Sequence, residues 1–169
     1  MHPDPSEVKR RYDSPMEPAA ERLAMFGQPS EVEPLAWAWV HDQLNAAGTY
    51  WVVTRSEGHA HPRPVWGIWD DGVLHLSIGS PEVARNLDRH PDVTVHLDSG
   101  TDVVIVEGRV TGPTAAPDLL ARYDAKYDWT YTVEAYGPLT TIAASTVLAW
   151  RSAGWAGRGG FQQTGRWRY

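Results

Sequence analysis

The stretch 60–87 (AHPRPVWGIWDDGVLHLSIGSPEVARNL) constrains the fold more than any other part of the chain. Its side chains alternate on both sides of the segment 70–72 (DDG), as they do in β-strands. The glycine of that segment tolerates a positive φ, which is typical of a tight hairpin turn. Ser80 can then cap a helix that begins at Pro81. The stretch therefore predicts a strand, a turn, a second strand and a short helix.

Polar and charged side chains of the same stretch can converge near the start of that helix. Arg63 lies in the first strand, Ser77 ends the second, Ser80 precedes the helix, and Arg85 and Asn86 lie late in it. Because a helix N-terminus attracts negative charge, this arrangement favours an anion. Simpler interpretations stay open: Arg63 as a surface cation on an edge strand, Ser77 as an ordinary strand hydroxyl, and Arg85 with Asn86 as a cap of the helix end.

The rest of the chain adds β-rich and helical segments to this unit. Strands are predicted at 49–54, 93–97, 103–110 and 146–151, and helices at 16–26, 35–47 and 114–136. About six antiparallel strands with flanking helices indicate a mainly β (α+β) fold, a small barrel. Prolines and charges mark residues 1–29 as an N-terminal arm, which leaves residues 30–169 as one domain.

Composition argues against several classes of protein. The chain has 169 residues, a net charge of −6 and no cysteine. A negative net charge argues against general nucleic-acid binding, and the lack of cysteine removes disulfides and thiolate chemistry. The sequence contains neither an apolar run that could span a membrane nor a charged-then-apolar leader. We therefore expect a cytoplasmic protein that binds neither nucleic acid nor membrane.

Nine tryptophans are the unusual feature of the composition. Indole rings in this number are expected to fill a core or an interface, and some can wall a ligand site. The terminal segment 164–169 (TGRWRY) is too aromatic for a solvated end, so we expect it to dock on the domain.

Histidines and carboxylates provide no clear catalytic or metal centre. His59 and His61 share a strand face, and His75 and His96 are candidates for neighbouring strands. Neither pair has a cysteine or an evident carboxylate partner to complete a metal site. The sequence also contains no supported Ser-His-Asp arrangement and no Gly-rich phosphate loop of known type. We therefore expect no metal site, and we assign no catalytic side chain.

Several short pieces, in this order, resemble the pyridoxamine 5′-phosphate oxidase-like family of flavin-binding split β-barrels. They are Tyr50-Trp51, 61–67 (HPRPVWG), 84–87 (ARNL), His90-Pro91, 95–97 (VHL), Ser99-Gly100, 103–108 (VVIVEG) and 166–169 (RWRY). The resemblance implies a split β-barrel and a homodimer with two cofactor sites at the interface. It implies FMN as the usual cofactor, the deazaflavin coenzyme F-420 in one branch, and haem in some relatives, for which His96 is a candidate axial ligand.

The resemblance also implies which residues bind the cofactor. They are Arg63, Pro64, Val65, Trp66, Ser77, Ser80, Arg85, Asn86 and Trp167. Arg63 would reach the cofactor phosphate, and Val65 and Trp66 would present main chain to the isoalloxazine ring. Ser77 would bind the phosphate or the ribityl chain, and Trp167 would belong to a tail that covers the site.

The segment 81–83 (PEV) departs from the family pattern, which often has Ser-Arg-Lys there. Two phosphate contacts are lost, at about 1.5–3 kcal/mol each for hydrogen bonds to charged groups. FMN should therefore bind weakly, and Val83→Lys is expected to tighten it; the deazaflavin coenzyme or an empty site are the alternatives. The resemblance implies an FMN-dependent oxidoreductase acting on a small planar substrate, in a pocket walled by Trp66, Trp69 or Trp167. The alternative is a non-catalytic module that binds or stores a flavin, a deazaflavin or haem.

Overall fold

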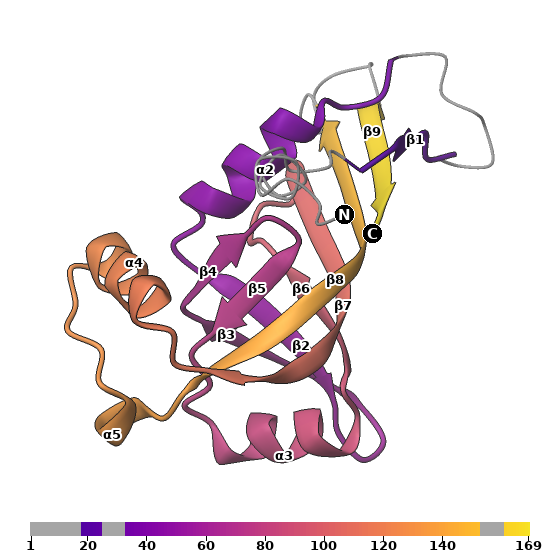
Figure 1. Ribbon diagram of the computed structural model, residues 1–169. Coiled ribbons are helices and arrows are strands. Elements are labelled where there is room, and N and C mark those ends of the chain that lie inside the picture. The colour runs from indigo at the N-terminus through magenta and orange to yellow at the C-terminus, as the bar shows by residue number, and fades with distance from the viewer. Residues whose placement is uncertain (1–17, 25–32, 153–160) are drawn as a thin grey trace, which may run out of the picture.

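The computed structural model describes residues 18–24, 33–152 and 161–169 of the chain (Figure 1). The strands are β1 (Ala20–Glu21), β2 (Tyr50–Arg55), β3 (Ala60–Val65), β4 (Gly67–Asp70), β5 (Val73–Leu76), β6 (Asp92–His96), β7 (Asp102–Thr114), β8 (Leu139–Ser152) and β9 (Phe161–Arg168). The helices are α2 (Trp37–Ala46), α3 (Pro81–Arg89), α4 (Pro117–Tyr127) and α5 (Val133–Tyr136). Among the described residues, every helix is too short or too polar to cross a membrane.

The long strand β8 divides the sheet into two branches. One edge of β8 pairs with β7, and the wall continues through β6 and β2 to β3. The other edge pairs with β5 along residues 140–143 and with β9 farther along the strand. All pairings are antiparallel, and β3 and β4 follow each other in the chain without pairing. The predicted mainly β split barrel is therefore confirmed, with more strands than the six expected.

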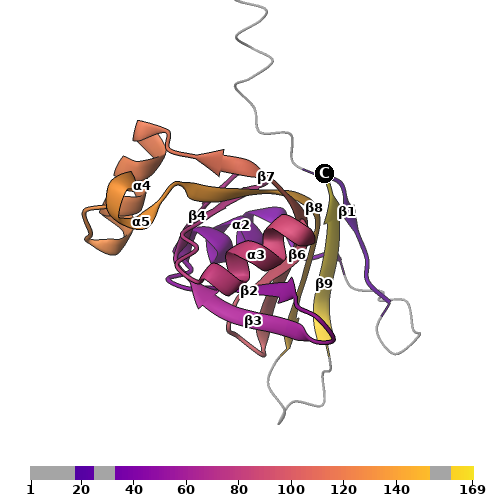
Figure 2. The same cartoon turned by 90° about the horizontal axis from the view of Figure 1, so that it is seen from below.

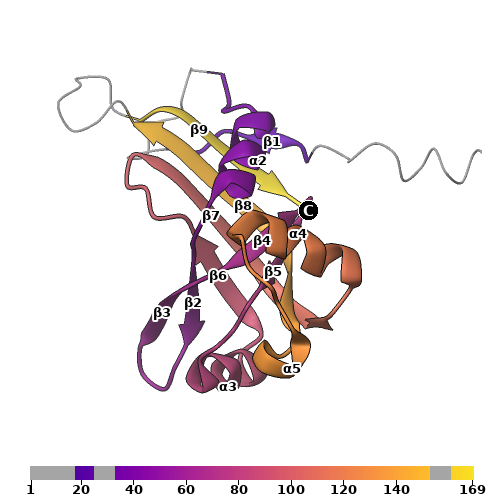
Figure 3. The same ribbon diagram turned by 90° about the vertical axis from the view of Figure 1, so that its left-hand side faces the viewer.

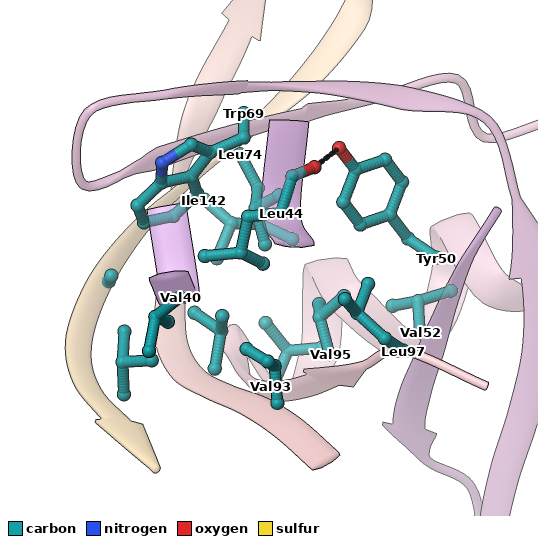
Figure 4. Close-up of a cluster of buried hydrophobic side chains, with 14 of the residues drawn as sticks. Val40, Leu44, Tyr50, Val52, Trp69, Leu74, Val93, Val95, Leu97 and Ile142 are labelled. Atoms are coloured by element: carbon teal, nitrogen blue, oxygen red, sulfur yellow. Dashed lines mark hydrogen bonds between the residues drawn. The ribbon is translucent and has the colours of Figure 1, made fainter. Parts of the chain in front are cut away.

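The interior of the barrel is filled by the inward-facing side chains of its strands and by α2 (Figure 4). The fully buried side chains there include Val40 and Leu44 of α2, Tyr50 and Val52 of β2, Leu74 and Leu76 of β5, and Val95, Val104, Ile142 and Val147. Each such aliphatic side chain contributes about 1.5–3 kcal/mol by leaving water. A second, smaller core lies under α4 and α5 and contains Ile68, Leu119, Tyr123, Tyr131 and Leu139.

The central stretch folds largely as predicted. Asp71 and Gly72, with φ of 43° and 94°, form the two-residue turn between β4 and β5. The hydroxyl of Ser80 accepts a hydrogen bond from the Val83 N–H, and α3 begins at Pro81. Seen from below, α3 lies across one end of the barrel (Figure 2). The turn and the cap were readable because each depends on a few adjacent residues.

The first predicted strand of this stretch is wrong in one respect, because it breaks into β3 and β4 at Trp66. The Ser77 N–H donates to the Trp66 carbonyl at 2.9 Å. Next to it, Gly67 packs so closely that a Cβ would lie 2.5 Å from Leu76 Cδ2 and 2.7 Å from the His75 carbonyl oxygen. The chain therefore turns from one branch of the barrel to the other here.

Three further predictions are corrected. The helix predicted at 114–136 is two helices, because Asp128 adopts a left-handed conformation after α4. The last predicted strand, 146–151, extends over all of β8. Of the helix predicted at 16–26, the described part contains β1, which pairs with β9, and the rest lies outside the described residues. The proposed arm 1–29 also lies largely outside them.

Candidate functional site

The junction between β3 and β4 is the candidate functional site. Val65 is half-buried at the end of β3, and Trp66 follows with 42% of its surface exposed. The half-buried Ser77 binds the Trp66 carbonyl through its backbone N–H, and its hydroxyl lies 3.4 Å from the Tyr131 hydroxyl. Three of the predicted cofactor residues, Val65, Trp66 and Ser77, are thus brought together by the break in the strand.

Three exposed arginines, on β2, β3 and α3, are available to bind an anion. Arg55, Arg63 and Arg85 are exposed and form no salt bridge with any described residue, whereas the other described arginines do. The guanidinium of Arg63 donates to the carbonyl of the preceding Pro62 at 2.8 Å. Pro64 is exposed beside it on β3, which among the described strands pairs only with β2. Unpaired guanidinium groups on β2, β3 and α3 are therefore open to a ligand phosphate.

The first turn of α3 contains the segment 81–83, where the sequence departs from the family pattern. Glu82 lies 3.6 Å from Nδ1 of His61, which is buried on β3. Val83 is fully buried in the main core. A lysine at position 83 would bury an unpaired charge rather than reach a ligand, so the expected benefit of Val83→Lys for FMN binding loses its basis.

Asn86 does not face solvent. It is buried, and its amide nitrogen donates to the Thr54 hydroxyl of β2 at 3.1 Å. The Thr54 hydroxyl in turn lies 3.4 Å from the His61 carbonyl oxygen. Asn86 therefore joins α3 to the barrel wall, while Arg85, one residue earlier, points outward and is exposed.

Trp167 lies away from the junction. Its side chain is fully buried in the main core, with its ring 5.3 Å from that of Trp37. The terminal segment docks as expected, but it does so as β9, which pairs with β8 and turns Trp167 inward. The predicted role of Trp167 in covering a cofactor therefore finds no support in the geometry of this protomer.

Two neighbouring residues of α4 hold the junction and were not predicted as site residues. The Tyr127 hydroxyl lies 2.9 Å from both the nitrogen and the oxygen of Gly67. Lys126 Nζ donates to the same oxygen at 3.1 Å and to the Tyr50 hydroxyl at 3.0 Å. Burial lowers the pKa of Lys126 to about 8. The sequence placed Tyr127 on a helix, but nothing local linked that helix to Gly67.

A groove among the described residues lies elsewhere. It has a volume of about 740 Å³ and lies by the β2–β3 hairpin and strands β6 to β8, lined by Thr54, Arg55, His59, Thr94, Glu107 and Ser145 among others. None of the nine predicted cofactor residues lines it. His75 and His96 lie on β5 and β6, which are not neighbouring strands, and the His96 ring stacks on Trp51. Among the described residues, no group of three or more His, Asp or Glu side chains could hold a metal ion.

Comparison with solved structures identifies the architecture. An F420 reductase is 17% identical, with a TM-score of 0.51 and coverage of 63% of this chain and 94% of that one. A FAD-binding protein from Mesorhizobium loti is 14% identical, with a TM-score of 0.52 over 80% and 97% of the two chains. A protein of the pyridoxinephosphate oxidase family from Clostridium acetobutylicum is 10% identical, with a TM-score of 0.55 over 79% and 96%.

Sequence comparison adds nothing to this likeness. No protein-family model matches the sequence, and no curated protein matches it significantly. At these identities the structural likeness concerns the fold, and it agrees with the antiparallel strands and the division of the sheet at β8. The chain therefore has the split β-barrel fold of the pyridoxamine 5′-phosphate oxidase-like proteins.

Proposed function

We propose that this protein binds a flavin-type cofactor at the β3–β4 junction and acts as an oxidoreductase on a small planar substrate. FMN is the first candidate, and the deazaflavin coenzyme is the second. The structural neighbours include an F420 reductase and a FAD-binding protein, which supports a cofactor of this type. We also propose that two copies pair and complete each other's cofactor site, as the resemblance implies.

The observation that carries the proposal is the set of groups at the junction. An unpaired arginine, Arg63, precedes an exposed indole, Trp66, and the start of α3 at Ser80 lies three residues beyond Ser77. Such a set fits a flat ring with an anionic tail, because a guanidinium and a helix N-terminus both favour phosphate. Glu82 in the first turn of α3 opposes a phosphate there, which directs the anion toward Arg63 and Arg85.

In this proposal the chain's own residues bind and orient the cofactor. A bound flavin supplies the hydride chemistry. Arg63 would hold the anionic tail, and the main chain at Val65 and Trp66 would bind the ring. The Gly67 peptide next to them is fixed by Tyr127 and Lys126, so the ring-binding backbone is held before the ligand arrives.

The alternative is a module that binds or stores a flavin, a deazaflavin or haem without catalysis. The pairing of Glu82 with His61 and the burial of Val83 favour it, because they leave the first turn of α3 without a cation. The absorbance spectrum of the purified protein separates these functions. A flavin that a reductant bleaches and an acceptor restores supports the oxidoreductase, and a Soret band supports haem.

Titration with FMN and with the deazaflavin coenzyme tests the site. Arg63→Ala should weaken binding about tenfold or more, since a hydrogen bond to a charged group contributes about 1.5–3 kcal/mol. The matched control is Arg89→Ala, which removes an exposed arginine of α3 that pairs with Glu57. Equal affinities for the wild type and Arg63→Ala would remove Arg63 from the cofactor site.

A further inference from the structure

Exposed aromatic side chains gather beside the proposed cofactor site. Trp66, Trp129, Tyr136 and Tyr169 are the described large hydrophobic residues that are 42–49% exposed. Three of them lie together, because the Trp129 ring is 6.0 Å from that of Trp66 and 6.1 Å from that of Tyr136. Leaving indole and phenol faces in water is unfavourable, so a cluster of them indicates a surface that binds something.

These three rings belong to a closed circuit, which we call the six-ring cluster. From Trp66 it passes through Tyr127, Tyr123, Tyr131, Tyr136 and Trp129 and back to Trp66, with centroid distances of 4.7, 4.8, 4.9, 5.2, 6.1 and 6.0 Å. The inner part is fixed, since Tyr123 and Tyr131 are buried and the Tyr131 hydroxyl donates to the Gly137 carbonyl at 2.9 Å. The outer rings therefore stand on a rigid base formed by α4, α5 and the strand break.

The two exposed indoles form a corner. Trp66 is stacked on Tyr127 with an interplanar angle of 4°, and Trp129 meets Trp66 at 83°. A flat ring that lies parallel to one indole is perpendicular to the other, so stacked and edge-to-face contacts form together. Trp129 also lines a hollow of about 370 Å³, together with Asp128 and Thr130.

The exposed charged side chains of the α4–α5 connection beside the corner are negative. Asp128 and Glu134 are exposed on either side of the α4–α5 connection. Of the two cations of the segment 117–136, Arg122 pairs with Asp70 at 2.9 Å. Lys126 is half-buried behind the corner, with Nζ 5.4 Å from the centre of the Tyr127 ring and hydrogen-bonded to Tyr50 and Gly67. Electron-rich indole faces and nearby carboxylates both favour a positive charge on the ligand and disfavour an anion.

We propose that the corner between Trp66 and Trp129 binds a flat aromatic cation of the pyridinium or quinolinium type. Calling this ligand the substrate rests on the proposed function, since the corner adjoins the β3–β4 junction. Binding itself does not depend on a flavin. The assay therefore uses the flavin-free protein, and a failed flavin titration leaves its result unaffected.

The probe is 1-methylquinolinium, titrated into the full chain at neutral pH while tryptophan fluorescence and calorimetric heat are recorded. Trp129→Leu should weaken binding about fivefold, the size expected from losing one aromatic contact to a cation. Tyr169→Leu, which alters an exposed aromatic outside the six-ring cluster, should leave the affinity unchanged. The double variant Asp128→Asn with Glu134→Gln should weaken binding of the cationic probe about threefold. Asparagine tolerates the left-handed backbone at position 128, so the substitution there should not disturb the fold.

Neutral quinoline, which lacks the charge, should bind more weakly than the probe and equally to the wild type and the double variant. The proposal is overturned if the probe does not bind, if Trp129→Leu binds it as the wild type does, or if quinoline binds as tightly. It is also overturned if Trp129→Leu changes only the oligomeric state in gel filtration, because the corner would then be an interface between copies.

Discussion

At the scale of single residues, burial decides the chemistry of groups that look ordinary in the sequence. Lys126 is a helical lysine whose amino group is partly desolvated and bonded to Tyr50 and to the Gly67 carbonyl. Its nitrogen also lies 4.9 Å from the centre of the Tyr50 ring. The Tyr50 hydroxyl donates to the Leu44 carbonyl at 2.6 Å (Figure 4), and burial raises the pKa of Tyr50. The lysine therefore links α4 to the main core.

The lowered pKa of Lys126 predicts a pH dependence of stability. Burial lowers this pKa from 10.5 to about 8, so the folded state holds the proton less tightly than the unfolded state does. The free-energy cost of burying the charged amino group is fully present below about pH 8. It decreases as the pH rises toward the pKa of the unfolded state. Relative to Lys126→Met, the wild type should gain stability between about pH 7.5 and about pH 9.5. Urea unfolding of both proteins measures this difference, and parallel pH curves would contradict it.

At the scale of elements, α4 takes the place of a strand beside β4. On its sheet side β4 pairs with β5, and α4 lies against its other side (Figure 3). Side chains of α4 bind the backbone there, with Tyr127 on Gly67 and Arg122 on the Trp69 carbonyl at 3.2 Å. These hydrogen bonds satisfy backbone groups that a sheet edge would leave to water. They also hold Trp66 at the start of β4, where the six-ring cluster begins.

Tyr127→Phe tests this role of α4. The change keeps the stack on Trp66 but removes the hydroxyl that bonds both polar atoms of Gly67. We expect a loss of about 1–2 kcal/mol in the free energy of unfolding. Tyr136→Phe is the matched control, because the exposed Tyr136 hydroxyl forms no hydrogen bond with any described residue. Chemical denaturation compares them, and equal midpoints would show that the Tyr127 hydroxyl does not hold the junction.

At the scale of the whole molecule, the terminal strand closes the fold. β9 pairs with β8 and β1, and Trp167 projects from it into the core against Trp37 of α2. Gly165 lies directly against the Trp167 ring, where any Cβ would clash with it. Segments from both ends of the described chain therefore meet on one side of the barrel (Figure 1).

Trp167→Ala should destabilise the whole molecule by about 3–5 kcal/mol, as expected for an aromatic residue removed from a core. Trp129→Ala removes the same side chain from an exposed position and should cost less than about 1 kcal/mol. Far-ultraviolet circular dichroism during urea unfolding gives both values. A similar cost for the two substitutions would mean that β9 contributes little to the barrel.

Some features of the site were readable from the sequence, and others were not. The candidate arginine, the indole beside it and the helix cap could be proposed because Arg63, Trp66 and Ser80 belong to short local patterns. Val83 was misjudged because its environment depends on which face of α3 meets the barrel. Lys126 was missed because its partner Gly67 is 59 positions away in the chain.

The sequence by itself determined the alternation of the strands, the turn at Asp71 and Gly72, and the cap at Ser80, because backbone preferences act over a few neighbouring residues. Together with the order of its short motifs, this was enough to indicate a split barrel. Only the tertiary structure decided the break at Trp66, the inward turn of Trp167 and the six-ring cluster. Each of these depends on packing between elements that are distant in the chain, and packing is set by the closing of the barrel rather than by local preference.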